Sequence, residues 1–91
     1  MRWRIAASEA LNWQDLDGEV AVRNDLTGST HLFDSLAAEL LHTLIKAENP
    51  LTPDELARRL AREGEAPGEL LTSIEAILSD FQRLGLAEPS D

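Results

Sequence analysis

The first quarter of the chain alternates apolar and polar residues, which is the pattern of strands that bury one face. The three runs are RWRIA (2–6), LNWQDL (11–16) and EVAVRN (19–24). Asp17-Gly18 separates the last two runs, and this dipeptide favours a two-residue hairpin loop. In that register Trp13 lies opposite Val22, so the apolar residues of both strands share one face. These runs predict an N-terminal, three-stranded antiparallel sheet.

From residue 34 onward the apolar residues take the spacing of amphipathic helices. The expected helices cover residues 34–49, 52–64 and 70–84. The second begins with a capping box of Thr52 and Glu55, with Pro53 in the first turn. The third carries an apolar seam from Leu70 to Leu84, which we expect to form the spine of the core. The predicted fold class is α+β and winged-helix-like, with the sheet followed by a three-helix bundle in a single domain, residues 1–91.

Charge and composition narrow the classes of function. Seventeen acidic and eight basic side chains give a formal net charge of −9, which repels nucleic acid and anionic lipid over most of the surface. The sequence has neither a secretory signal pattern nor an apolar run of the roughly 20 residues that cross a bilayer. It has no cysteine, so a disulfide framework and thiolate metal sites are excluded. We therefore expect a cytoplasmic protein without membrane or nucleic-acid partners.

The segment TGSTHLFD (27–34) is the first candidate for chemistry. It lacks the Lys-Ser or Lys-Thr pair of a phosphate-binding loop. Ser29, His31 and Asp34 are too close together on one turn to form a catalytic triad. The expected role is structural, with Gly28 supplying a positive φ where the chain leaves the third strand. His31 and His42 form no ligand pair, so we expect no metal, no cofactor and no enzymatic activity.

Residues 52–84 have the outline of a helix-turn-helix, which winged-helix proteins often place on DNA. The outward positions of the third helix are mostly acidic or neutral, and Arg83 is their one cation. This face would repel the major groove. A winged-helix DNA-binding regulator is therefore the alternative function and not the first.

A sheet of three strands must have free edges, which can accept an extended peptide as a further strand. We predict that residues 19–24 form such an edge beside the third helix, leaving a groove with apolar walls. Ala21 and Arg23 point away from the core on this strand. Arg23 then lies on the outer face with Arg2 and Arg4. These arginines either provide a local positive spot or only protect the edge from aggregation, and both interpretations stay open.

The order of elements resembles the PqqD family of small peptide chaperones, which are related to the recognition elements of ribosomally made, modified peptides. The resemblance covers nearly the whole chain, and its most distinctive part is the turn with Thr27, Gly28, His31 and Leu32. It extends to a PqqD-like subgroup encoded beside a protein related to HPr kinases. It implies a leader segment bound as an added strand along the third strand and against the third helix. The peptide-binding residues implied in this way are Val20, Ala21, Val22, Arg23, Leu71, Ile74 and Leu78.

The leading hypothesis is a non-enzymatic adaptor that captures a precursor or leader peptide by strand addition. The resemblance implies delivery of that peptide to a modifying enzyme, either radical-SAM or HPr-kinase-related. The alternatives are the DNA-binding regulator and a regulatory subunit that docks on a kinase-like enzyme through its helices. A free edge allows a homodimer as well as a monomer, and the sequence leaves the two open.

Overall fold

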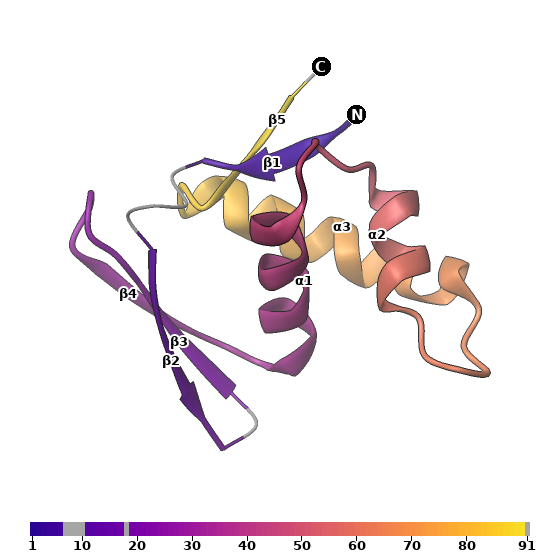
Figure 1. Cartoon of the computed structure of the whole chain (residues 1–91), viewed down its shortest axis with the longest axis horizontal. Helices are drawn as coiled ribbons and strands as arrows, with labels where there is room; N and C mark the ends of the chain where they lie inside the picture. The colour runs from indigo at the N-terminus through magenta and orange to yellow at the C-terminus, as the bar shows by residue number, and fades with distance from the viewer. Residues whose placement is uncertain (7–10, 18, 91) are drawn as a thin grey trace.

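A computed structural model of the chain describes residues 1–6, 11–17 and 19–90, in which three helices and two antiparallel sheets form the fold (Figure 1). In chain order the elements are β1 (Trp3–Ile5), β2 (Leu11–Leu16), β3 (Glu19–Asn24), β4 (Ser29–Phe33), α1 (Ser35–Lys46), α2 (Pro53–Leu60), α3 (Pro67–Arg83) and β5 (Ala87–Pro89). The predicted α+β class, with a three-stranded antiparallel sheet and three helices, is confirmed. Within the described ranges no helix has the length and apolar character needed to span a membrane.

The hairpin of β2 and β3 has the predicted register. Trp13 pairs with Val22, and Leu16 pairs with Glu19 across the two-residue connection. Val20 and Val22 are buried, whereas Arg23 on the opposite face is exposed. The predicted loop includes residue 18, which lies outside the described residues. The predicted register is confirmed. It places the side chains of both Val20 and Val22 in the core.

The first strand does not join this hairpin, and that part of the prediction is wrong. β1 pairs instead with β5 near the other end of the chain, with Ile5 opposite Ala87. Trp3 also forms a bridge with Leu51, just before α2. β1 and β5 therefore form a separate two-stranded sheet that ties the ends of the described chain to the helices (Figure 1).

The third strand of the main sheet is β4, which covers most of the segment predicted to be only a turn. The strand order is β2-β3-β4, so β3 is central. The turn is shorter than expected: Asn24 Oδ1 accepts a hydrogen bond from the Leu26 amide, and Gly28 reverses the chain with a φ of 76°. After Gly28 the burial alternates along STHLF, as in a strand with one covered face.

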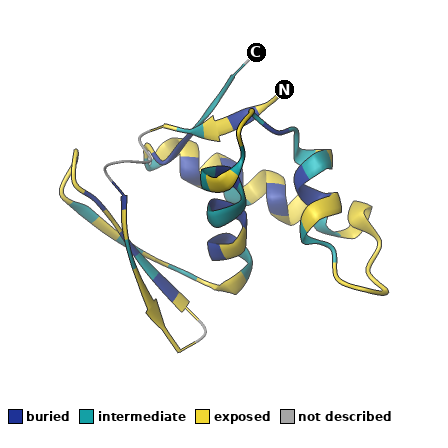
Figure 2. Ribbon diagram, viewed as in Figure 1, coloured by how far each residue is buried: buried dark blue, intermediate teal, exposed yellow. Residues whose placement is uncertain are grey.

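Helix α1 lies between the main sheet and the other two helices (Figure 1). Asp34 caps it by accepting a hydrogen bond from the Ala37 amide. The predicted capping box of Thr52 and Glu55 begins α2 and is confirmed. α2 ends at Leu60, four residues earlier than predicted, and α3 starts earlier, at Pro67. Figure 2 shows the buried residues collected on the inner faces of these helices and of β3.

Candidate functional site

The predicted peptide-binding strand is not an edge. β3 pairs along one side with β2 and along the other with β4, so that Val22 lies between Trp13 and His31. An added strand could reach the backbone of Val20–Arg23 only by displacing one of these neighbours. The edge prediction for β3 is therefore wrong, because β4 folds back from Gly28 and occupies the side that was expected to be free.

Two of the three predicted helix residues belong to the core. Ile74 is 0% exposed and Leu78 is 1% exposed, so neither can touch a peptide in this structure. Leu71 is half-buried. Other half-buried apolar residues of this helix and its end, such as Ile77 and Leu84, pack at the margin of the core. The apolar seam of α3 contains both residues buried in the core and half-buried residues at its margin. Only the packing of α3 against the other elements decides which residues are buried.

Within the described part of the chain, β4 pairs only with β3 and leaves its other side open. Residues on a strand direct their backbone N–H and C=O groups to alternate sides. Leu16 and Glu19 close a two-residue loop and are therefore hydrogen-bonded to each other. Starting from this pair, the side to which the backbone groups of each residue point can be assigned along β2, then β3, then β4. Thr30 and Leu32 are the positions whose backbone groups point to the open side of β4.

The side chains of β4 suit contact with a partner. Leu32 is 57% exposed on the outer face, where it pairs with Ala21, and Leu26 in the preceding turn is 74% exposed. The strand itself, STHLF, contains no acidic or basic residue apart from His31. An uncharged edge with an exposed leucine lacks the protection that isolated edge strands usually carry.

The far end of β4 lies against α3. The rings of Phe33 and Phe81 meet edge to face, with centroids 5.2 Å apart and an interplanar angle of 72°. His31 lies on the same face of the strand, with its ring centroid 6.2 Å from that of Phe33. Ile77, one helical turn before Phe81, is half-buried and packs against the core. The expected juxtaposition of an edge strand and the third helix therefore exists, but β4 provides the strand.

The sequence contained a signal for this edge. Ser29, His31 and Phe33 alternate with Thr30 and Leu32, and the run is rich in residues that favour strands. Thr27-Gly28 precedes this short alternation and favours a turn, so the sequence alone predicts a turn over these residues. Phe33 is the apolar residue in this run that indicates a strand packed against the core.

Two polar side chains of this segment, those of Thr27 and Asp34, have structural partners. The Asp34 carboxylate is the N-cap of α1, and Thr27 Oγ1 accepts a hydrogen bond from the Ser29 amide. Among the described residues no group of three or more His, Cys, Asp or Glu side chains could hold a metal ion. The segment is therefore best described as a capped turn followed by an edge strand.

Comparisons with known proteins identify the fold. No protein-family profile matches the chain, and no curated protein matches its sequence. A structure of TbiB1 in complex with the TbiA(β) leader peptide superposes with a TM-score of 0.73 and 17% identity, covering 97% of this chain and 98% of that one. A lasso peptide synthetase B1 complexed with the leader peptide gives a TM-score of 0.71 and 18% identity, covering 98% of this chain and all of the other. At these identities the likeness shows a shared fold, that of two proteins solved with leader peptides.

Proposed function

We propose that this chain is a non-enzymatic adaptor that binds a precursor or leader peptide as an added strand on β4, beside α3. The observation that carries the proposal is the open, uncharged edge of β4 at the point where Phe33 meets Phe81. Thr30 and Leu32 offer backbone hydrogen bonds, and alternate peptide side chains would lie toward α3 or toward solvent. Ala21 and Arg23 remain in the proposed site as outer-face neighbours of these two residues.

The fold comparisons support this proposal. Both similar structures are complexes with a leader peptide, and one is described as a lasso peptide synthetase component. We propose accordingly that the peptide is presented to a modifying enzyme. The PqqD resemblance points to a radical-SAM or HPr-kinase-related enzyme, whereas the similar structures point to a peptide synthetase system.

The DNA-binding alternative receives less support. The exposed side of α3 carries Glu69, Glu75 and Asp80, and its cation Arg83 is paired with Asp80 at 2.9 Å. That face presents negative charge to an incoming phosphate backbone. Retention of a random DNA duplex at low salt would restore this alternative.

The test compares two proline variants, one on each free edge of the main sheet. Thr30→Pro removes an N–H on the open side of β4, and Asp15→Pro does the same on the open side of β2. Labelled peptides encoded near the gene are titrated against each variant by fluorescence anisotropy. A strand-forming peptide should bind the unmodified chain with a dissociation constant of about 1 μM or below, roughly −8 kcal/mol.

We expect Thr30→Pro to weaken this binding at least about tenfold, or about 1.4 kcal/mol, and Asp15→Pro to leave it unchanged. Circular dichroism checks that both variants fold. Should Thr30→Pro fail to fold, the exposed Leu32→Glu substitution tests the same edge. Equal binding by all variants, or no peptide bound below a millimolar dissociation constant, would contradict the proposal.

A further inference from the structure

The peptide strand proposed for β4 has little backbone to pair with. Thr30 and Leu32 are the two positions of this five-residue strand whose N–H and C=O groups point to its open side. Hydrogen bonds made on binding replace hydrogen bonds to water, so each contributes little net affinity. Micromolar binding therefore needs an apolar anchor as well, because a few buried side chains supply most of the affinity of an interface.

Helix α3 continues the apolar wall of this site beyond the strand. Phe81, whose ring meets Phe33, is preceded by Ile77 four residues earlier and by Leu70 eleven residues earlier. At 3.6 residues per turn, the side chains on α3 lie within about 40° of one another around the helix, along a row about 16 Å long. Phe81 is buried, and the other two are half-buried. The row leads from β4 to the first turn of α3.

A small apolar pocket lies at this end of the row, where the three helices meet. It has a volume of about 230 Å³. Each helix contributes one half-buried leucine to its lining, namely Leu36 of α1, Leu60 of α2 and Leu70 of α3. We call it the three-leucine pocket. Its size is below the range of about 300 to 1,000 Å³ that is usual for small-molecule sites, so it suits one side chain better than a free ligand.

The charged residues that line the pocket form its rim. Glu39, Arg62 and Glu65 are exposed. Arg62 Nη2 lies 3.7 Å from Glu39 Oε1, and the Arg62 amide donates a hydrogen bond to Glu65 Oε1 at 2.8 Å. An apolar side chain can therefore enter between the leucines while these charged groups stay in contact with water and with one another.

The pocket is also close to β4 along the chain. β4 ends at Phe33, and Ser35, the first residue of α1, already lines the pocket. The chain from Leu32 to Ser35 spans at most about 10 Å, and the row on α3 spans about 16 Å. An extended peptide rises about 3.3 Å per residue. A peptide paired with Leu32 therefore reaches the pocket about three to five residues further on.

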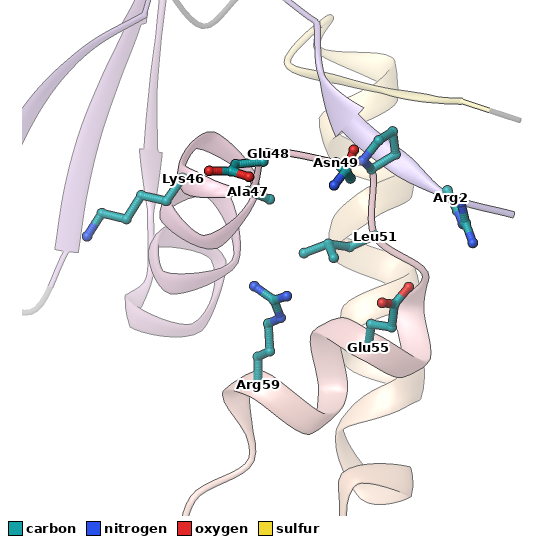
Figure 3. A pocket seen from close by; sticks show the side chains of 9 residues that line it. Arg2, Lys46, Ala47, Glu48, Asn49, Leu51, Glu55 and Arg59 are labelled. Atoms are coloured by element: carbon teal, nitrogen blue, oxygen red, sulfur yellow. The ribbon is translucent and has the colours of Figure 1, made fainter.

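A larger hollow of the molecule suits this role less well. It has a volume of about 610 Å³ and lies beside Lys46, the last residue of α1. Figure 3 shows Lys46 pointing away from the hollow, with charges of both signs, Arg59 and Glu55, in its walls. Glu55 is already part of the α2 capping box. Because α1 has 12 residues and is about 18 Å long, the hollow is separated from the end of β4 by the length of this helix.

We propose that the three-leucine pocket holds one large apolar side chain of the bound peptide, about three to five residues from the segment that pairs with β4. The pocket follows from the three leucines, and only its occupant rests on the proposed function. A branched aliphatic or aromatic side chain fits best, since these bury the most apolar surface per residue. The pocket then selects peptides by the spacing between their strand-forming segment and this anchor.

The first test needs no peptide. N-acetyl-phenylalanine amide, which carries one apolar side chain, is titrated to about 20 mM while the leucine methyl groups are followed by NMR. The methyl signals of Leu36 and Leu60 should shift with a dissociation constant in the millimolar range, whereas those of the exposed Leu16 and Leu26 should not. Equal shifts at all leucines, or none at the pocket, would overturn the proposal.

A pair of variants on α3 provides the control. Leu70→Glu places a carboxylate in the pocket, and Thr72→Glu adds the same charge at an exposed position on the opposite side of the helix. Leu70→Glu should weaken binding of N-acetyl-phenylalanine amide at least about tenfold, and Thr72→Glu should leave it unchanged. Circular dichroism checks folding, and Leu36→Glu replaces Leu70→Glu if needed, because the first turn of α1 favours an acidic residue. Equal losses in the two variants would contradict the assignment of the pocket.

The second test uses leader peptides whose binding is measured by fluorescence anisotropy. Each apolar residue within about five residues of the strand-forming segment is replaced by serine in turn. One replacement should weaken binding to the unmodified chain at least about tenfold, but binding to Leu70→Glu less than about twofold, because both changes remove the same contact. Losses that multiply, or no replacement with such an effect, would overturn the proposal. Thr30→Pro should keep the shifts caused by N-acetyl-phenylalanine amide, so the pocket and the β4 edge fail separately.

Discussion

The main sheet has two free edges in the described part of the chain, and they differ in what surrounds them. On the β2 side, Trp13 stacks on His42 of α1 at 4.0 Å, and Asp15 lies on the strand just before Asp17 and Glu19. On the β4 side the strand has no carboxylate, exposes Leu32 and meets α3 through Phe33. Charge protects one edge from pairing, whereas the other is left able to accept a strand. The two edges of this sheet therefore differ in charge and in the apolar surface beside them.

The largest expected effect comes from removing the ring that joins β4 to α3. Phe81→Ala deletes a side chain that is 0% exposed and should lower the free energy of unfolding by about 3 to 4 kcal/mol. Trp13→Ala on the other edge should cost less, about 2 kcal/mol, because that ring is half-buried. Urea denaturation measures both. A larger loss of unfolding free energy in Trp13→Ala than in Phe81→Ala would contradict the inference that packing supports the β4 edge more strongly than the β2 edge.

Exposed leucines near each edge allow a comparison without loss of stability. Leu32 on β4 is 57% exposed and Leu16 on β2 is 43% exposed. Leu32→Glu should weaken leader-peptide binding about tenfold, or about 1.4 kcal/mol, since it places a charge on the uncharged edge. Leu16→Glu should leave binding unchanged. Both variants should unfold within about 0.5 kcal/mol of the unmodified chain, and a loss of binding in Leu16→Glu would contradict the assignment of the edge.

A change distant from both edges provides the control for stability alone. Thr52→Ala removes the N-cap of α2 and should cost about 1 kcal/mol of stability. Because α2 contributes to neither edge, peptide affinity should not change. A parallel loss of affinity would mean that binding follows global stability and not the β4 edge.

The smallest effect concerns pH. The pKa of Glu55 is lowered in the folded chain, mainly by hydrogen bonds from Thr52. A lowered pKa means that the ionised group contributes stability above its unfolded pKa, near 4.5, and that this contribution is lost as the pH falls through the folded pKa. Glu55→Gln should therefore reduce the free energy of unfolding at neutral pH and differ less from the unmodified chain in acid. Denaturation at pH 7 and at lower pH measures this, and a difference that grows in acid would contradict it.

Local signals in the sequence were sufficient for much of the fold. The register of β2 and β3 follows from Asp17-Gly18 and the alternation around it, and the start of α2 follows from Thr52 and Glu55. Both features depend on residues close together in the chain. The pairing of β1 with β5 joins residues more than 80 positions apart, and no local pattern reports it.

The candidate site depended on such long-range contacts. The alternation of residues 29–33 could be seen, but the partner of β3 on its second side is decided by packing of Phe33 against α3. In the same way, the helical seam placed Ile74 and Ile77 together, although one is in the core and the other at its margin. Strand order and helix orientation decide such cases, and both are tertiary properties.

Amide hydrogen exchange of the whole chain, with and without a bound leader peptide, tests the open β4 edge most directly. The account predicts that exchange at Thr30 and Leu32 slows on binding, because their N–H groups point to the open side of β4. Exchange at Trp13 and Asp15, which point to the open side of β2, should stay unchanged. Protection at β2 instead of β4, or at neither edge while the peptide is bound, would contradict the account.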